Sequence, residues 1–283
     1  MRLGLVSRPA GPAVVVELSS RLVELPAGTV PADLVAILGS ADLRRKVEAA
    51  AASAPTVDAA SLTWLAPVPN PGKIICVGLN YADHAAESPY AKPDYPVYFL
   101  RVNTSVVAHG APLVRPRVSE QFDYEGEMVA VIGKGGRAIP QSQALDHVVA
   151  YSIFNDGSVR DYQFKGPQWT LGKNFDGTGP FGPMLVSADE LPPGATGLRL
   201  ETILNGQTVQ SASTDDLLFP VAELVAKASE AMTLEVGDVI VTGTPAGVGF
   251  ARKPPLFMKH GDVCEVRIEK IGTLSNPVRD EVA

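Results

Sequence analysis

The sequence has few of the features that mark secreted, membrane or nucleic-acid-binding proteins. Its 283 residues include only two cysteines, Cys76 and Cys264, and both lie in apolar strand-like patterns without a metal-ligand spacing. This argues against a disulfide framework and a sulfur-based metal site, and it predicts two buried free thiols.

Long apolar runs are also missing. No segment approaches the roughly 20 apolar residues that a membrane helix needs. The apolar start at Met1 ends at Ser7-Arg8-Pro9, which argues against a signal peptide. These absences predict a soluble, cytoplasmic protein without a membrane partner.

The chain has no basic cluster. Its net charge is −7 and the acidic residues are spread along it, which argues against nucleic acid as a partner. The Gly-rich run at 243–249 lacks a following Lys-Ser/Thr and leads toward Pro254-Pro255 rather than a helix. A phosphate-binding loop is therefore not expected there.

What is present is strand patterning. Helices are expected only at 31–52 and after Pro220, and Asn205-Gly206 is a strong hairpin signal because both residues tolerate positive φ. Strand-like segments fall at 74–79, 98–100, 128–132, 148–154, 198–204, 239–242 and 263–269. The pattern predicts a mixed α+β fold dominated by β-structure.

Prolines divide the chain near residue 70. Pro55, Pro67, Pro69 and Pro71 disfavour a helix because each restricts its own backbone and that of the residue before it. We therefore expect a small N-terminal accessory domain at 1–70 and a larger domain at 71–283.

The most informative segment of the larger domain is 123–133, which contains two carboxylates two residues apart. Because alternate residues of a strand share a face, Glu125 and Glu127 point the same way. Such a pair repels itself unless a cation or proton lies between, and oxygen ligands suit a hard ion such as Mg²⁺ or Mn²⁺. Asp156, at the end of another apolar strand, is the expected third ligand. The alternative is a solvated strand edge.

Five motifs occur in an order that resembles the fumarylacetoacetate hydrolase family. The motifs lie at 73–87, 123–133, 155–163, 169–176 and 242–249, and the likeness extends from about 73 to 276. It implies the family's β-roll fold for the catalytic domain at 71–283, a homodimer, and Mg²⁺ or Mn²⁺ bound by Glu125, Glu127 and Asp156.

The resemblance also implies roles for other residues. His84 and Glu87 are three apart in an alanine-rich segment, so on a helical turn they would be neighbours. The family likeness makes them a lid dyad that activates water; an unrelated surface pair is the alternative. Lys173 would support developing negative charge, with a solvated lysine as the alternative. The expected substrate contacts are Tyr81, Arg160, Gln163, Gly243 and Thr244. The alternative for Arg160 and Gln163 is that they only brace the loop of the third ligand.

These assignments predict a metal-dependent hydrolase. It would cleave a carbon–carbon bond in a 2,4-dioxo acid of the acylpyruvate or fumarylpyruvate type, giving pyruvate and an acid. The alternative is an isomerase or decarboxylase acting on a 2-oxo or 2-hydroxymuconate-type diacid or on oxaloacetate. A non-enzymatic alternative is a metal-bound binding protein without turnover.

Overall fold

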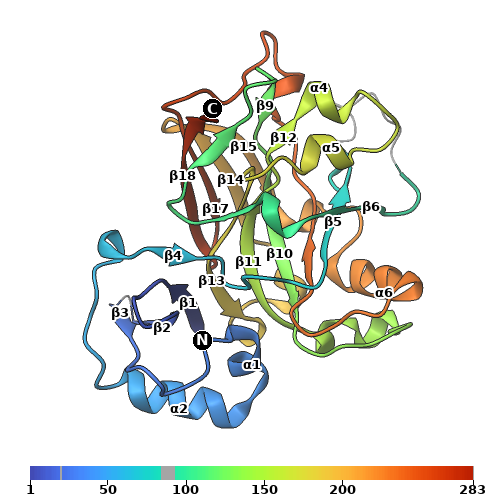
Figure 1. Ribbon diagram of the computed structural model, residues 1–283. Helices are drawn as coiled ribbons and strands as arrows, with labels where there is room; N and C mark the ends of the chain where they lie inside the picture. Colours follow the sequence, from blue (N-terminus) through green and yellow to red (C-terminus); the bar gives the residue numbers. More distant parts are fainter. Residues whose placement is uncertain (20, 84–92, 283) are drawn as a thin grey trace.

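The computed structural model describes residues 1–19, 21–83 and 93–282. Strands dominate a mixed α+β molecule, as predicted. Figure 1 shows a large body built on long strands and a smaller lobe formed by the N-terminal residues. The described α-helices are α1 Leu34–Gly39, α2 Ala41–Ala51, α4 Arg160–Gln163, α5 Thr170–Lys173 and α6 Val221–Ala231.

The main sheet has eleven strands in the described chain. Its order is β3-β2-β1-β13-β11-β10-β16-β5-β6, with β4 paired to β1 and β7 to β13. These strands are β1 Arg2–Val6, β2 Ala13–Leu18, β3 Arg21–Glu24, β4 Trp64–Leu65, β5 Ile74–Gly78, β6 Val97–Arg101, β7 Val106–Ala108, β10 Gly126–Ile132, β11 Val148–Asn155, β13 Gly179–Ser187 and β16 Val239–Val241.

A second sheet has five described strands in the order β15-β14-β17-β18-β8. They are β8 Leu113–Arg115, β14 Arg199–Leu204, β15 Gln207–Ser213, β17 Val263–Ile268 and β18 Gly272–Asp280. The predicted hairpin joins β14 to β15, with φ of 52° at Asn205 and 80° at Gly206. A short pair, β9 Phe122–Asp123 with β12 Ser158–Val159, lies beside the site.

The two sheets share one apolar core. Met128 and Ile153 of the main sheet belong to the same buried cluster as Leu200 and Val266 of the second sheet. In β17 the burial alternates as the sequence predicts, because successive strand residues point to opposite faces. Strands β10 and β11 both contribute to this core, and the site lies at the start of β10 and the end of β11.

The N-terminal residues continue the main sheet. Strand β1 pairs antiparallel with β13, and Leu3 lies opposite Leu185. The single helix expected at 31–52 is wrong in detail: α1 and α2 are separated at Ser40, whose φ is −120° and whose side chain accepts a hydrogen bond from the N–H of Leu43. A serine favours this N-cap role over a helix interior. The domain boundary near residue 70 stays a prediction.

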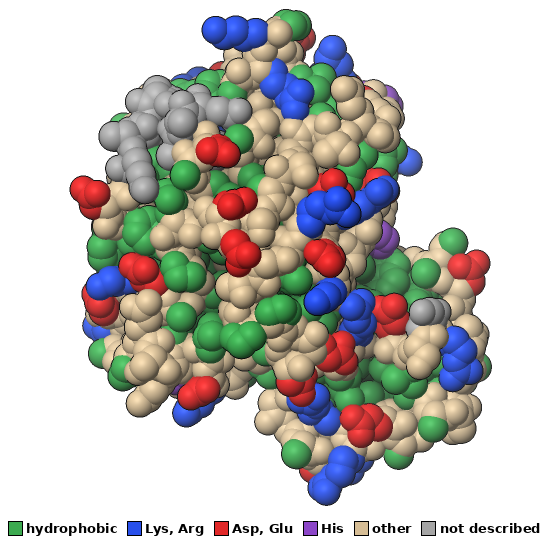
Figure 2. All heavy atoms as spheres, turned by 180° about the vertical axis from the view of Figure 1, so that it is seen from behind, with side chains coloured by type: hydrophobic (Ala, Val, Ile, Leu, Met, Phe, Trp, Pro, Cys, Tyr) green, Lys and Arg blue, Asp and Glu red, His purple; other side chains and the backbone are tan. Residues whose placement is uncertain are grey.

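Other elements agree with the sequence. Helix α6 follows Pro220 and buries Leu224, Val225 and Ala228. Cys76 and Cys264 are free and buried. None of the described helices is long and apolar enough to cross a membrane. On the face shown in Figure 2, acidic and basic side chains are interspersed among apolar ones.

Candidate active site

Two strand ends bring the acidic residues together. Glu125 lies between β9 and β10, and Asp156 directly follows β11. The side-chain oxygen of Asn155 accepts from the N–H of Glu125 at 3.0 Å, and the N–H of Asp156 donates to the Glu125 carbonyl at 2.8 Å. The antiparallel pairing of β10 with β11 therefore places the predicted third acid beside the first.

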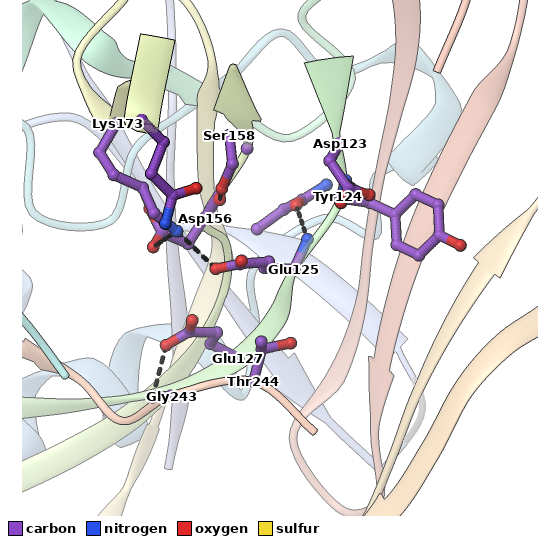
Figure 3. Close-up of polar contacts among 12 residues, drawn as sticks. Asp123, Tyr124, Glu125, Glu127, Asp156, Ser158, Lys173, Gly243 and Thr244 are labelled. Carbon is purple, nitrogen blue, oxygen red and sulfur yellow. Dashed lines mark hydrogen bonds and ion pairs between the residues drawn. The ribbon is translucent and has the colours of Figure 1, made fainter. Parts of the chain in front are cut away.

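Glu125, Glu127 and Asp156 form a compact carboxylate triad. One oxygen from each lies within 4.8 Å of the others, and all three side chains are buried. Figure 3 shows them pointing toward one another. Burial raises the pKa of Glu127 well above its usual range, and the negative charges of Asp156 and Glu125 raise it further. Such oxygens suit Mg²⁺ or Mn²⁺, which the triad could hold.

Lys173 lies against this triad and is not the solvated lysine of the alternative interpretation. Its Nζ donates to Glu125 Oε2 at 2.6 Å and to Asp156 Oδ2 at 2.7 Å. Burial alone would lower the pKa of Lys173, but attraction by Asp156 and Glu125 outweighs it and the pKa lies above its usual value. The side chain is therefore an ammonium group at neutral pH.

Asn174 anchors the short helix that carries Lys173. Its side-chain amide donates to the carbonyls of Leu100 and Thr170 and accepts from the N–H of Val102. Because Leu100 and Val102 flank the end of β6, Asn174 fixes α5 against that strand. The position of the Lys173 ammonium group thus depends on the main sheet.

Arg160 connects two of the acids. Its Nε donates to Asp123 Oδ2 at 2.8 Å, its Nη2 lies 2.7 Å from Glu125 Oε1, and its Nη1 donates to Gln163 Oε1 at 2.9 Å. Burial would lower the pKa of Arg160, but Asp123 and Glu125 raise it above the usual value. Arg160 and Gln163, two predicted substrate contacts, therefore brace one another at the pocket.

Arg101 and Asp123 were not predicted to belong to the site. Arg101, the last residue of β6, is buried, forms an ion pair with Asp156 and donates to Thr178 Oγ1. Asp123 is fully buried and accepts from the backbone N–H groups of Gly249 and Phe250. Charged residues at the ends of apolar strands were the signal that could have identified both.

Gly243 and Thr244 already have protein partners. The N–H of Gly243 donates to Glu127 Oε2 at 2.5 Å. The Thr244 hydroxyl donates to the Gly126 carbonyl at 3.0 Å and accepts from Gln210 Nε2 at 2.8 Å. Gln210, which the sequence did not single out, thus orients Thr244. A substrate contact by either group would have to replace one of these bonds, and that role stays a prediction.

Tyr81 is a predicted substrate contact that lies apart from this arrangement. Tyr81 is buried, and its hydroxyl has no hydrogen-bond partner among the described residues. Burial raises its pKa, and the charge of Glu127 adds to the shift. Tyr81 lines a neighbouring hollow with Asp216 and Pro245, not the carboxylate pocket. His84 and Glu87 lie outside the described residues.

The carboxylate pocket combines charged and apolar walls. Besides the triad, it is lined by two cations, two polar side chains and seven apolar or small residues. These are Lys173 and Arg160; Gln163 and Thr244; and Val77, Gly78, Leu79, Phe99, Phe164, Trp169 and Phe250.

Several known proteins are similar to this chain in sequence or in fold. Residues 73–279 match the family described as fumarylacetoacetate (FAA) hydrolase C-terminal. Two similar relatives are the oxaloacetate tautomerase fahd2, mitochondrial, of Xenopus laevis, 44% identical over 221 residues (77% of this chain, 69% of the relative), and the oxaloacetate tautomerase YisK of Bacillus subtilis, 44% identical over 218 residues (75% and 72%).

A solved structure is also similar to this chain in fold. The fumarylacetoacetate hydrolase from psychrophilic Exiguobacterium antarcticum has a TM-score of 0.86 with 36% identity, covering 99% of this chain and 100% of that one. These matches confirm both the resemblance predicted from the five motifs and the predicted fold class.

Proposed function

This chain belongs to the fumarylacetoacetate hydrolase family, and on that premise we propose that it is a tautomerase of 2-oxo acids. It would interconvert the keto and enol forms, and oxaloacetate is the first substrate to test. The names of the two relatives at 44% identity support this isomerase alternative better than the carbon–carbon bond hydrolase expected first.

The observation that carries the proposal is the ammonium group of Lys173 against the buried carboxylate triad. Tautomerisation moves a proton between C3 and the 2-oxo oxygen, and negative charge develops on that oxygen. A cationic donor in a buried site stabilises such charge strongly.

Glu125, Glu127 and Asp156 would hold a divalent cation. When bound, Mg²⁺ or Mn²⁺ supplies positive charge that makes the C3 proton of a 2-oxo acid easier to remove. Repulsion within the triad, expressed in the raised pKa of Glu127, is relieved by such a cation.

The other polar groups would bind and orient the substrate. Lys173 stays protonated because its pKa is raised, so it acts as a hydrogen-bond donor to the 2-oxo oxygen and not as the base. Arg160 and Gln163 line the same pocket, and in this proposal they would contact the substrate carboxylate. Asp123 accepts a hydrogen bond from Arg160 and so keeps its side chain in position.

The test is the decay of the enol absorbance of oxaloacetate in the presence of Mg²⁺-loaded protein, compared with the spontaneous rate. We expect acceleration that chelation abolishes and that Asp156→Asn weakens, because the amide removes a full charge from the metal ligands. Arg199→Gln, on the surface of β14, is the control and should leave the rate unchanged.

Parallel assays separate the alternatives. Pyruvate release from acetylpyruvate without faster tautomerisation would favour the hydrolase. Pyruvate release from oxaloacetate would favour the decarboxylase. Metal binding without turnover of any of these substrates would favour the binding protein.

A further inference from the structure

The carboxylate pocket has a concentration of aromatic rings that the chemistry proposed above does not use. The whole sequence has only 2 Trp and 9 Phe in 283 residues. Trp169, Phe99, Phe164 and Phe250 all line this one pocket. The rings form two pairs, and each pair lies next to one cation of the pocket. Each pair forms a wall, and the carboxylate triad with the two cations forms the polar floor.

The first wall consists of Trp169 and Phe99. The ring centroids lie 5.6 Å apart at an interplanar angle of 75°, an edge-to-face contact. Gly78 permits this arrangement, because a Cβ atom there would lie 2.2 Å from the Trp169 ring. The Lys173 ammonium nitrogen lies 5.3 Å from the Phe99 centroid. The apolar surface of this wall is therefore directly next to the charged floor of the pocket.

The second wall consists of Phe164 and Phe250, whose centroids lie 5.5 Å apart. The Arg160 guanidinium lies 5.4 Å from the Phe250 centroid. The backbone N–H of Phe250 is held by Asp123, so this ring is anchored to the same acid that positions Arg160. Phe164 is 42% exposed, which leaves part of its ring available at the rim.

The charges of the pocket match one carboxylate better than two. Lys173 and Arg160 are the cations that line it in the described chain, and both contact carboxylates of the floor. A second carboxylate at the far end of a substrate would therefore lie against aromatic faces, where desolvation is costly. A planar apolar ring would gain from the same contacts.

We propose that the site takes 2-oxo acids whose C3 carries an aromatic ring, with phenylpyruvate as the simplest member of the class. This rests on the proposed function. The 2-oxo acid end faces the triad and Lys173, and the ring lies between the two walls. During the reaction the C3–H bond breaks and an O–H bond forms on the 2-oxo oxygen, so no oxidant or second substrate is needed.

The kinetic test compares two substrates in the Mg²⁺-loaded protein. We expect acceleration of phenylpyruvate tautomerisation, and Phe164→Ala should lower the ratio of kcat/KM for phenylpyruvate to that for oxaloacetate by about 10-fold, from lost ring contact. Tyr95→Ala is the matched control, because Tyr95 is 51% exposed and does not line the pocket. It should leave the ratio unchanged.

A binding test decides the inference independently of turnover. Trp64→Phe leaves Trp169 as the sole tryptophan. We expect 3-phenyllactate, an unreactive analogue, to change its fluorescence at lower concentration than malate does, and Phe164→Ala to weaken this response. If malate binds as well as 3-phenyllactate, or if Phe164→Ala leaves the substrate ratio unchanged, the inference is wrong while oxaloacetate turnover stands. If neither 2-oxo acid is turned over, the proposed function fails, and the titration still decides where the ring binds.

Discussion

Lys173 compensates the charge of two buried carboxylates, so its removal should affect both folding and chemistry. We expect Lys173→Met to lower the unfolding free energy in EDTA by about 3–5 kcal/mol, the usual cost of leaving a buried charge unpaired. Added Mg²⁺ should restore much of this stability, because the cation replaces the missing charge. Tautomerase activity should stay low, since the donor to the 2-oxo oxygen is gone.

Denaturant unfolding with EDTA or Mg²⁺ measures the effect. Lys227→Met is the matched control, because Lys227 pairs with Glu230 at 3.0 Å on the surface and should matter little there. Equal stability of Lys173→Met and the parent protein in EDTA would contradict the charge-compensation argument.

The two thiols should be unreactive in the folded protein. Burial raises the pKa of Cys76 well above its usual value and that of Cys264 to about 12. The folded state therefore keeps both thiol protons while the unfolded state loses them above the ordinary thiol pKa. Stability contributed by these groups is present below that pH and is lost as the pH rises toward the folded-state values.

We expect no reaction with a thiol reagent at pH 8 and reaction of two thiols in guanidinium chloride. Stability measured at pH 10 should be lower than at pH 8, and a variant with Cys76→Ala and Cys264→Ala should lose part of that pH dependence. Rapid labelling of the native protein would show that one strand carrying a thiol opens readily.

At the scale of elements, the end of β5 and the start of α5 meet at Gly78. An added methyl group there would overlap the Trp169 ring, so Gly78→Ala should displace that ring or destabilise the protein by about 1–3 kcal/mol, as overpacking does. Gly39→Ala is the control, because no atom lies within 4 Å of a Cβ built there. Thermal unfolding and Trp169 fluorescence in the Trp64→Phe background measure both effects. Unchanged fluorescence and stability in Gly78→Ala would contradict the close contact.

The elements that sequence patterns predicted are those with local signals. Mainly apolar runs predicted β10 and β11, and the acidic residues next to these runs identified Glu127 and Asp156 as candidate ligands. The Asn205-Gly206 turn was predicted because its backbone preference is intrinsic to two residues. Strand β13 was missed, because Pro180, Gly182 and Pro183 interrupt its apolar pattern.

The rest of the site depends on contacts between distant residues. Arg101 reaches Asp156 only because β6 and β11 belong to one sheet, and Asp123 meets Gly249 through a loop that returns from far along the chain. No local pattern encodes such pairings. Lys173 and Arg160 contact different groups of the site, and these contacts likewise follow from distances that a sequence does not display.

For the whole molecule, the resemblance predicts a homodimer. The exposed apolar residues Leu100, Val102 and Leu171 have neighbouring backbones, because Asn174 hydrogen-bonds to the backbone of all three residues. Contiguous exposed apolar surface favours association. Light scattering at micromolar concentration should give twice the 29.8 kDa chain mass, and Leu171→Asp should shift the mass toward one chain. A single-chain mass for the parent protein would contradict the prediction.

The pairing of β1 with β13 has a consequence for synthesis on the ribosome. Leu3 emerges long before its partner Leu185, because more than 180 residues separate them in the chain. Until then the edge of β1 that pairs with β13 is open, and it can pair with another chain. The pairing of β1 in the main sheet is therefore completed only after β13 has been made. Conditions that slow elongation between these two strands should increase aggregation of the unfinished chain more than they affect the finished protein.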